Sequence, residues 1–455
     1  MPPHDTRAPI AGRSAAEIAD SVRGLIERGS LAAGDALPPV RALAERLGVN
    51  RNTAVAAYGL LARWGLVETH GRGGTRVAGG PAVPQEGYAG PQAGIAASGA
   101  PRDVGDGNPD PALIPDPARA LRSATGRPVL YGEAVIDPGL EAWARAWMAP
   151  DAPDADFRLT VTSGAVDAVE RLLSQALTRD DAVALEDPCF LASIHTVRLG
   201  GYRPVPVPVD DEGMTVDGLR AALAEGVRAV VCTPRAQNPT GASLSARRAA
   251  ELRGLLAEHP YVLVIEDDHF SMLSQRPYHS LIGPEHRRWA LIRSVSKFLG
   301  PDMCLAVTAS DPHTADRLAM RLTPGTTWVS HLLQRLVHAL VTDADVIEEI
   351  ERAGRHYARR NAAFAERLTA HGVPAAPGDG LNLWVRVPVP ARPVAEQLMR
   401  RGWLARIGDD FVLDADGEPS MRLRLTVHDL DDADAEQLAA DVAAAVRVAA
   451  ERVSP

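Results

Sequence analysis

Lysine is almost absent from this chain. Of the 48 lysines and arginines among its 455 residues, Lys297 is the single lysine and the other 47 are arginines. Imine chemistry needs a primary amine that can lose its proton, which a guanidinium cannot supply. Lys297 is therefore a candidate for covalent chemistry, with an ordinary surface lysine as the alternative.

Cysteines and long apolar runs are also scarce. Cys189, Cys232 and Cys304 lie far apart and form no CxxC pair, which argues against a disulfide framework or a structural zinc site. The longest uncharged stretch, residues 87–101, is broken by Gly, Pro and Gln, and no apolar run approaches the roughly 18 residues that span a bilayer. The first residues lack the pattern of a secretion signal. We expect a soluble, cytoplasmic protein without a metal site or a membrane partner.

The charge is unevenly distributed along the chain. With 46% hydrophobic and 23% charged residues, there is enough apolar material for two or three domains, which excludes a disordered or fibrous protein. Residues 11–77 contain nine arginines and six acidic residues, a net charge of +3, although the whole chain carries −10. Because residues 1–10 hold one Asp and one Arg, the remainder carries −13. A small basic head on an acidic body indicates that the head contacts a polyanion.

The head has the pattern of a helix-turn-helix. A capping-box spacing starts at Ser14 and opens a first amphipathic helix, and a second short helix is predicted over residues 40–47. Asn50 then caps a third helix over residues 51–64. In this motif the last helix places its N-terminal side chains in the major groove of DNA, where Arg can read guanine and Asn can read adenine. The side chains at that position are Arg51, Asn52 and Thr53.

Two short strands are predicted after these helices, over residues 66–70 and 75–78. The glycine-rich turn between them holds Arg72, and Arg76 lies on the second strand. This arrangement predicts a wing whose arginines lie near phosphates or the minor groove.

The segment LPPVRALAERLGVNRNTAVAAYGLLARWGLVETHGRGGTRV resembles the winged helix-turn-helix of GntR-type regulators. The resemblance implies contacts to a double-stranded DNA operator through Arg41, Arg51 and the wing. The alternative is a three-helix module that binds protein.

The body has the pattern of an α/β domain. Residues 79–103 are rich in Gly, Pro and Ala and are predicted to form a linker. From about residue 159, β-rich runs alternate with helical patterns, which predicts a mostly parallel sheet. Ligands of such sheets bind beyond the carboxyl ends of the strands. Four of these ends carry candidate chemistry: Ser163-Gly164-Ala165, Asn238 in NPTG, Asp267 and Lys297.

Together these residues describe a pyridoxal 5′-phosphate (PLP) site. Lys297 would form an imine with the cofactor aldehyde, and Asp267 would keep the pyridine nitrogen protonated. The helix N-terminus at residues 163–165 and the hydroxyls of Ser294 and Ser296 could hold the phosphate, and Phe190 could stack on the ring. Taken singly, each residue has a plain alternative as a turn, a strand-end cap or a core residue.

The strings TSGAVDA, EDPCF, TPRAQNPTG, VIEDDHF and SVSK occur in the order seen in fold-type I aminotransferases, and this resemblance covers residue 103 to the C-terminus. Joined to a GntR-type head, the chain resembles a MocR-type regulator, and EDDHF, RSVSKFLGPD and WVSHLLQ are most similar to the PtsJ-type branch. The resemblance implies a homodimer that responds to PLP, or to an amine or amino acid, and controls vitamin B6 salvage. It also implies that Asn238 bonds the phenolic oxygen of PLP, that Tyr131 reaches the phosphate of the neighbouring subunit, and that Arg424 binds a carboxylate.

Two positions depart from the family pattern. His269 stands where the family has a tyrosine that bonds the phenolic oxygen, and an imidazole can donate a similar bond but titrates near neutrality. Cys304 stands seven residues after the lysine, where the family has a phosphate-binding arginine. That contact is worth about 1.5 to 3 kcal/mol, or roughly ten- to hundredfold in affinity, unless Arg293 compensates. We therefore expect weaker PLP binding than in relatives that carry the arginine.

The predicted architecture is multidomain. A winged helix-turn-helix covers residues 1–78, a linker covers 79–103, and an aminotransferase-like domain of fold type I covers 104–455. Within that domain we expect a large PLP-binding part at about 155–330 and a small part formed by 104–154 and 340–455.

Three functions fit these observations. The first is a PLP-responsive transcriptional regulator that uses the aminotransferase-like domain as an effector sensor and not as an enzyme. The second is an active aminotransferase with an accessory DNA-binding domain, which is kept open by Asp267, Lys297 and Arg424. The third is a regulator that has lost PLP and uses its body for dimerisation. Cys304 and His269 favour this alternative.

Overall fold

The computed structural model describes residues 10–64, 66–69, 74–78, 101–322, 327–414 and 417–453. The chain divides into two compact units, Met1–Val83 and Pro84–Pro455. Residues 102 and 103, which were assigned to the linker, form strand β3 (Arg102–Asp103) of the second unit and pair with β13 (Trp403–Leu404). The predicted linker therefore ends earlier than expected, because its last residues are held by a strand of the body.

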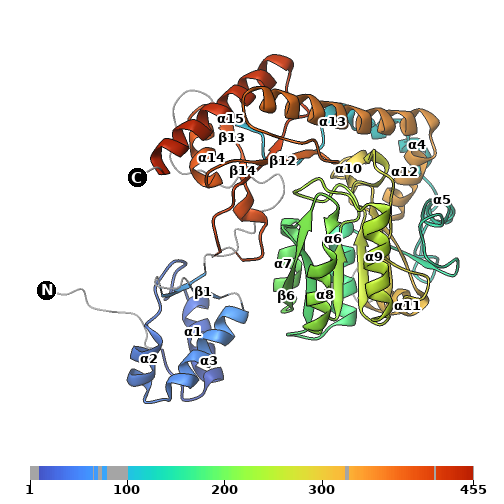
Figure 1. Cartoon of the computed structure of the whole chain (residues 1–455). Helices are drawn as coiled ribbons and strands as arrows, with labels where there is room; N and C mark the ends of the chain where they lie inside the picture. Colours follow the sequence, from blue (N-terminus) through green and yellow to red (C-terminus); the bar gives the residue numbers. More distant parts are fainter. Residues whose placement is uncertain are drawn as a thin grey trace. The chain divides into compact units, whose positions relative to one another are not determined.

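The N-terminal unit contains the predicted helices and wing strands (Figure 1). Ser14 caps the first helix by accepting a hydrogen bond from the Glu17 N–H (3.2 Å), and Asn50 caps the third through the Asn52 N–H (2.8 Å). Ile18, Leu43 and Leu61 are completely buried in one core shared by the helices. The elements are α1 (Ala15–Glu27), α2 (Val40–Leu47), α3 (Arg51–Arg63), β1 (Val67–Thr69) and β2 (Thr75–Val77).

The C-terminal unit contains, among its described residues, a sheet of eight strands in the order β4-β11-β10-β9-β8-β5-β6-β7. The five strands from β10 to β6 run parallel, whereas β11 is antiparallel to both of its neighbours and β7 is antiparallel to β6. The predicted α/β fold is thus confirmed. The strands are β4 (Arg158–Thr162), β5 (Ala182–Asp187), β6 (Arg203–Asp210), β7 (Gly213–Met214), β8 (Ala229–Cys232), β9 (Leu263–Asp267), β10 (Trp289–Ser294) and β11 (Ala306–Ser310).

Alternate residues of these strands face two different cores. On β5, Val183 and Leu185 pack with α6 and α7, whereas Ala182 and Ala184 pack with α8 and α9. Because successive side chains of a strand point to opposite faces, helices cover the sheet on both faces, and this explains the nearly continuous apolar runs. The helices around this sheet are α4 (Leu121–Ala124), α5 (Pro138–Met148), α6 (Ala165–Ala176), α7 (Leu191–Leu199), α8 (Val216–Ala224), α9 (Ala246–Ala257), α10 (Ser296–Leu299), α11 (Pro312–Leu322) and α12 (His331–Val341).

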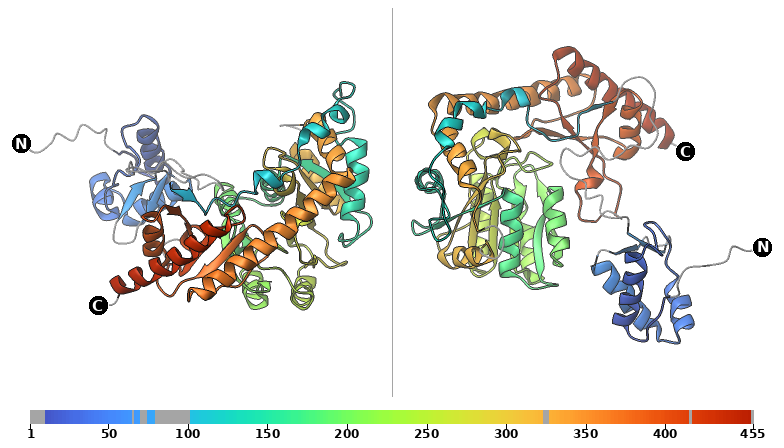
Figure 2. Two further views of the ribbon diagram at one scale, coloured as in Figure 1. Left: turned by 90° about the horizontal axis from the view of Figure 1, so that it is seen from above. Right: turned by 180° about the vertical axis from the view of Figure 1, so that it is seen from behind.

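A smaller antiparallel sheet follows, in the order β12-β15-β14. Helix α13 (Ala344–Ala370), the long orange helix in Figure 2, joins the two parts, because Ile350 packs in the core of the large sheet and Leu368 in the core of the small one. The remaining elements are β12 (Asn382–Arg386), α14 (Ala391–Met399), β14 (Arg406–Ile407), β15 (Arg422–Thr426) and α15 (Asp432–Val453).

The sequence suggested that residues 104–154 belong to the smaller part, but only some of them do. Val104 is buried in the core of the small sheet, but Leu140 and Met148 of α5 are buried in the core of the large sheet. The segment starts at one core and ends at the other, which local sequence patterns do not reveal.

One buried carboxylate connects three strand ends of the large sheet. Asp268, directly after β9, accepts hydrogen bonds from Nε (2.7 Å) and Nη2 (2.9 Å) of Arg235 and from Nε (2.8 Å) of Arg293. Arg293 also donates to the carbonyl of Trp147 (2.9 Å) and pairs with Asp151, both near the end of α5. Burial raises the pKa of Asp268, but the hydrogen bonds and charges of Arg235 and Arg293 lower it overall, so that this carboxylate is ionised.

We expect Arg293→Met to destabilise the C-terminal unit by about 3 to 5 kcal/mol, because it leaves the buried carboxylate of Asp268 with one charge partner fewer. Arg158→Met is the matched control, since the Arg158–Asp316 pair is largely exposed (54% and 64%) and contributes less than about 1 kcal/mol. Urea unfolding of both variants measures the difference. Equal losses in the two variants would contradict a dominant role for the buried pair.

Candidate functional site

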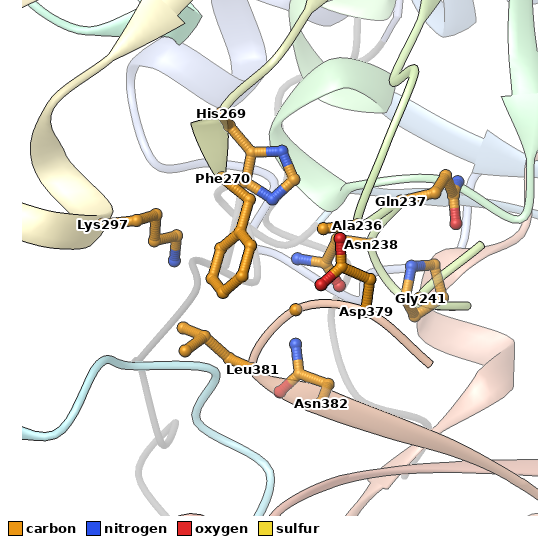
Figure 3. A pocket seen from close by; sticks show the side chains of 12 residues that line it. Ala236, Gln237, Asn238, Gly241, His269, Phe270, Lys297, Asp379, Leu381 and Asn382 are labelled. Carbon is orange, nitrogen blue, oxygen red and sulfur yellow. The ribbon is translucent and has the colours of Figure 1, made fainter. Parts of the chain in front are cut away.

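The carboxyl ends of β8, β9 and β10 meet at a pocket. Asn238 lies in the loop after β8, His269 lies two residues after β9, and Lys297 lies in α10, which follows β10. The pocket is lined by these residues together with Ala236, Gln237, Pro239, Gly241, Phe270, Asp379, Gly380, Leu381 and Asn382 (Figure 3). In Figure 3, the side chains of Lys297, His269 and Asn238 come from three separate segments, as parallel strand ends require.

Asp267 ends β9 immediately beside this pocket. Its Oδ1 is buried and has no hydrogen-bond partner. Burial, and then the negative charge of Asp268, raises the pKa of Asp267 to about 7, while the positive charge of Lys297 opposes the shift. A buried carboxyl oxygen without a partner is positioned to bond a cationic N–H of a ligand, which would return Asp267 to its ionised form.

His269 is neutral at physiological pH. Burial, and then the positive charge of Lys297, lower its pKa to about 4. The expectation that this imidazole titrates near neutrality is therefore wrong, because its surroundings remove the water that would stabilise the charged form. The neutral ring can still donate one hydrogen bond.

Arg424 is completely buried and lies close to Asn238. Its Nη1 donates to Oδ1 of Asn238 (3.1 Å), its Nη2 donates to the carbonyl of Gly105 (2.6 Å), and its guanidinium lies 4.8 Å from the ring centre of Phe411. Arg422, two residues earlier on β15, is instead close to Arg386, whose charge adds to burial in lowering the Arg422 pKa. Strand periodicity places both arginines on the same face of β15, and of the two it is Arg424 that bonds Asn238.

A second group of predicted residues is joined by contacts at the start of α6. The hydroxyls of Ser294 and Ser296 are 3.0 Å apart, and Ser296 Oγ lies 3.5 Å from the carbonyl of Met303. The neighbouring Cys304 Sγ donates to the carbonyl of Ser163 (3.3 Å). Gly164 precedes Ala165, the first residue of α6, with φ of +89°, and a side chain on it would meet Cys304 Sγ at 3.1 Å.

This group is less favourable to an anion than a typical helix N-terminus. The Ser163 N–H donates to Oδ2 of Asp167 (3.1 Å), so a carboxylate of the same helix already occupies one donor. The exposed Cys304 supplies no charge, and Arg293 is held by Asp268, Trp147 and Asp151. Arg293 is therefore not available to take the place of a phosphate-binding arginine at Cys304.

Two predicted residues lie away from the pocket lining. Phe190 is the half-buried N-cap of α7, and its stacking role stays a prediction. Tyr131 is 90% exposed, with its ring 5.5 Å from that of Trp328. Its contact with a neighbouring subunit also stays a prediction.

Sequence reasoning missed part of the pocket. Gln237 donates to Oε2 of Glu186 (3.3 Å) and to the carbonyl of Pro188 (2.8 Å), and Asp379 and Asn382 come from the loop before β12 and from β12 itself. The amide next to Asn238 in AQNPTG was the available signal for Gln237. No local pattern places the GDGLN segment beside it, since about 140 residues separate them.

The described members of the predicted DNA-reading set lie at the starts of α2 and α3 and on β2 of the N-terminal unit. Arg51 and Asn52 are exposed at the start of α3, and Thr53 is half-buried. Arg41 is exposed on α2, and Arg76 on β2 donates to the carbonyl of Gly34 (2.8 Å). Arg72 lies outside the described residues.

Neither a metal centre nor a membrane span was predicted. Across the described ranges, no group of three or more His, Cys, Asp or Glu side chains could hold a metal ion. In the same ranges, no helix combines the length with the apolar character that crossing a bilayer needs.

Comparisons with known proteins divide the chain in the same way. Residues 14–77 match the gntR family of bacterial regulatory proteins, and residues 103–442 match the aminotransferase class I and II family. Both predicted resemblances, and with them the fold class, are confirmed.

Among related proteins, the chain is 46% identical over 434 residues to the vitamin B6 salvage pathway transcriptional repressor PtsJ of Salmonella typhimurium, with 95% of this chain and 98% of that protein covered. It is 26% identical to the probable rhizopine catabolism regulatory protein MocR of Rhizobium meliloti, with 78% and 77% covered. The solved structure of LysN, an α-aminoadipate aminotransferase from Thermus thermophilus complexed with N-(5′-phosphopyridoxyl)-L-leucine, has a TM-score of 0.67 at 22% identity, with 77% and 93% covered. At that identity the likeness concerns the fold.

We expect the ligand-free Asp267→Asn variant to gain stability relative to the wild type as the pH rises. The unfolded Asp267 loses its proton near pH 4 but the folded one near pH 7, so the folded state binds more protons between these values and its stability falls with increasing pH. Asparagine removes this loss, which amounts to about 2 to 3 kcal/mol between pH 5 and pH 8. Urea unfolding at both pH values measures the gain, and a pH-independent difference would contradict the raised pKa.

Proposed function

Because the chain belongs to the GntR family of regulators, in the group whose C-terminal part is a class I and II aminotransferase domain, we propose that it is a transcription regulator that responds to PLP. Its N-terminal unit makes it a DNA-binding protein. The proposal concerns what the body binds and what that binding changes.

The observation that carries the PLP proposal is that Asp267 lies directly beside the pocket that Lys297 lines. The buried, unpartnered Oδ1 of Asp267 fits the protonated pyridine nitrogen, and the single lysine of the chain lies at the end of the next strand. PLP supplies an aldehyde whose carbon forms a C=N bond with an amine, with loss of water.

The other residues would bind and orient the cofactor. Asn238 and the neutral His269 would bond its phenolic oxygen, and Phe190 would lie against its ring. The phosphate would be held by Ser163, Gly164, Ala165, Ser294 and Ser296. Arg424 would bind a carboxylate of an amine or amino acid effector, because the charge-assisted bond between a guanidinium and a carboxylate is strong where the guanidinium is buried.

We further propose that the regulator acts as a homodimer and controls vitamin B6 salvage or metabolism. The similarity to PtsJ supports the pathway. Exposed apolar side chains support the dimer: Tyr131 beside Trp328, Leu121 on α4 and Leu332 on α12, which packs against α4. Exposed apolar patches of this kind mark interaction surfaces, and Tyr131 would reach the phosphate site of the partner.

A working aminotransferase is the second candidate. It is favoured by the presence of Lys297, Asp267 and Arg424 in one fold with a neutral histidine beside them. A sensor needs amine exchange at Lys297 but no transfer of the amino group to a keto acid. Turnover of L-amino acids and 2-oxoglutarate by the full-length protein would therefore favour the enzyme.

The proposal is tested by a visible absorption titration of the full-length protein with PLP beside Lys297→Ala. We expect a saturable band that requires Lys297. With double-stranded DNA selected from a random library by the full-length protein, PLP should change the DNA affinity of the wild type by roughly five- to 150-fold, but not that of the variant. A protein that shows no band at millimolar PLP would instead be a regulator without this cofactor.

Cys304→Arg should tighten PLP binding roughly ten- to hundredfold, because it restores a charged phosphate ligand next to Ser163. Cys304→Ser is the matched control, and it should leave the dissociation constant within about twofold. The absorption titration measures both variants. If Cys304→Arg binds PLP no more tightly than Cys304→Ser, the expectation that Cys304 weakens PLP binding is wrong.

A further inference from the structure

Residues 103–110, which we call the strap, lie where the chain enters the body, and the Gly107 carbonyl is within hydrogen-bond distance of the pocket residue Lys297. The strap is held at its start, where the Val104 N–H donates to the carbonyl of Leu404 (2.9 Å) and the Val104 carbonyl accepts from the Thr426 N–H (2.7 Å). Gly105 packs so closely on β14 that a side chain on it would meet the backbone nitrogen of Arg406 at 2.7 Å.

The carbonyls of the strap accept hydrogen bonds from the two cations expected to bind ligand. Lys297 Nζ donates to the carbonyl of Gly107 (3.2 Å), and Arg424 Nη2 donates to the carbonyl of Gly105 (2.6 Å). These backbone carbonyls thus occupy the positions beside the two cations where negatively polarised atoms of a ligand would bind. A ligand that engages either cation must compete with the strap.

The far end of the strap is held by side chains of the body. The Gly107 N–H donates to Oγ1 of Thr426 (3.1 Å), and the Asp110 N–H donates to the hydroxyl of Tyr357 (3.2 Å). Nε2 of His428 lies 2.8 Å from the carbonyl of Asn108. Several separate hydrogen bonds, each modest in water, hold this short segment.

We propose that PLP at Lys297 releases the strap from the pocket, and that this release is the signal passed to the DNA-binding unit. The inference rests on the proposed function. A C=N bond at Nζ removes the ammonium donors that Gly107 uses, so the bond to its carbonyl is lost as the ligand binds. In the sequence, the strap directly follows the segment that links the body to the N-terminal unit.

The coupling is reciprocal by thermodynamic linkage. If PLP releases the strap, then loosening the strap must favour PLP, because less of its binding free energy is used for displacement. A purely structural segment would have no such effect, since damage to it would weaken binding or leave it unchanged.

Hydrogen exchange on the full-length protein tests the release directly. With PLP at saturation, judged by the absorption band in the same sample, we expect the Gly107 and Asp110 amides to exchange several-fold faster. The Val230 and Ile265 amides in the central strands serve as internal references and should not change. If the band forms and the strap amides exchange at the same rate or more slowly, the inference is wrong and the PLP proposal stands. If no band forms, both are wrong.

Tyr357→Phe removes one hydrogen bond that holds the strap and changes no residue that lines the pocket. It removes the acceptor of the Asp110 N–H but keeps the ring contacts with Phe270 (6.4 Å between centroids) and His428 (4.9 Å). Loss of one such hydrogen bond should tighten PLP binding by roughly two- to tenfold. It should also reduce the ratio of DNA dissociation constants measured with and without PLP, because part of the release has already occurred.

Tyr202→Phe is the matched control, because Tyr202 is partly buried between α7 and β6, away from the strap. It should leave the PLP affinity and the DNA ratio within about twofold of the wild type. Weaker or unchanged PLP binding by Tyr357→Phe would overturn the inference, as would a DNA ratio equal to that of Tyr202→Phe.

Discussion

The geometry of the pocket depends on the ionised carboxylate of Asp268. Arg235, one of its partners, begins the loop that carries Asn238, and Arg293, the other, lies on β10 shortly before Lys297. Asp268 itself adjoins Asp267. One buried ion cluster therefore ties together the three strand ends from which the pocket residues project. Its partners are well aligned and desolvated, so removing one of them leaves a buried charge that is less fully compensated.

The same charge sets the protonation of its neighbour. A carboxylate held ionised beside Asp267 makes a second negative charge costly, so that without ligand Asp267 keeps its proton up to about pH 7. Lys297 has the opposite influence on Asp267, and its charge adds to the burial that keeps His269 neutral. The charges around Asp267 therefore favour a ligand with a cationic ring nitrogen and disfavour a further anion. This agrees with the weak anion site formed around Ser163 and Cys304.

Much of the fold and part of the site could be predicted from sequence. Apolar runs and alternating patterns located the strands, and Ser14 and Asn50 marked helix starts to within one residue. Asn238 and Lys297 were predicted because parallel strand ends meet at one edge, and His269 because the resemblance to aminotransferases places a residue that bonds the cofactor at this position. Gln237, Asp379 and the strap carbonyls were missed, since a turn amide, a loop carboxylate and a glycine backbone carry no local signature of a binding site.

The sequence by itself determined the two families, the order of the candidate residues at successive strand ends and the special position of the single lysine, because these follow from residue types and short-range periodicity. Only the tertiary structure decided that His269 is neutral, that Arg293 is committed to Asp268 and Asp151, and that Gly105 and Gly107 cover Arg424 and Lys297. Protonation and hydrogen-bond partners depend on desolvation and on groups brought together from positions 25 to 319 residues apart, which no short window of the sequence contains.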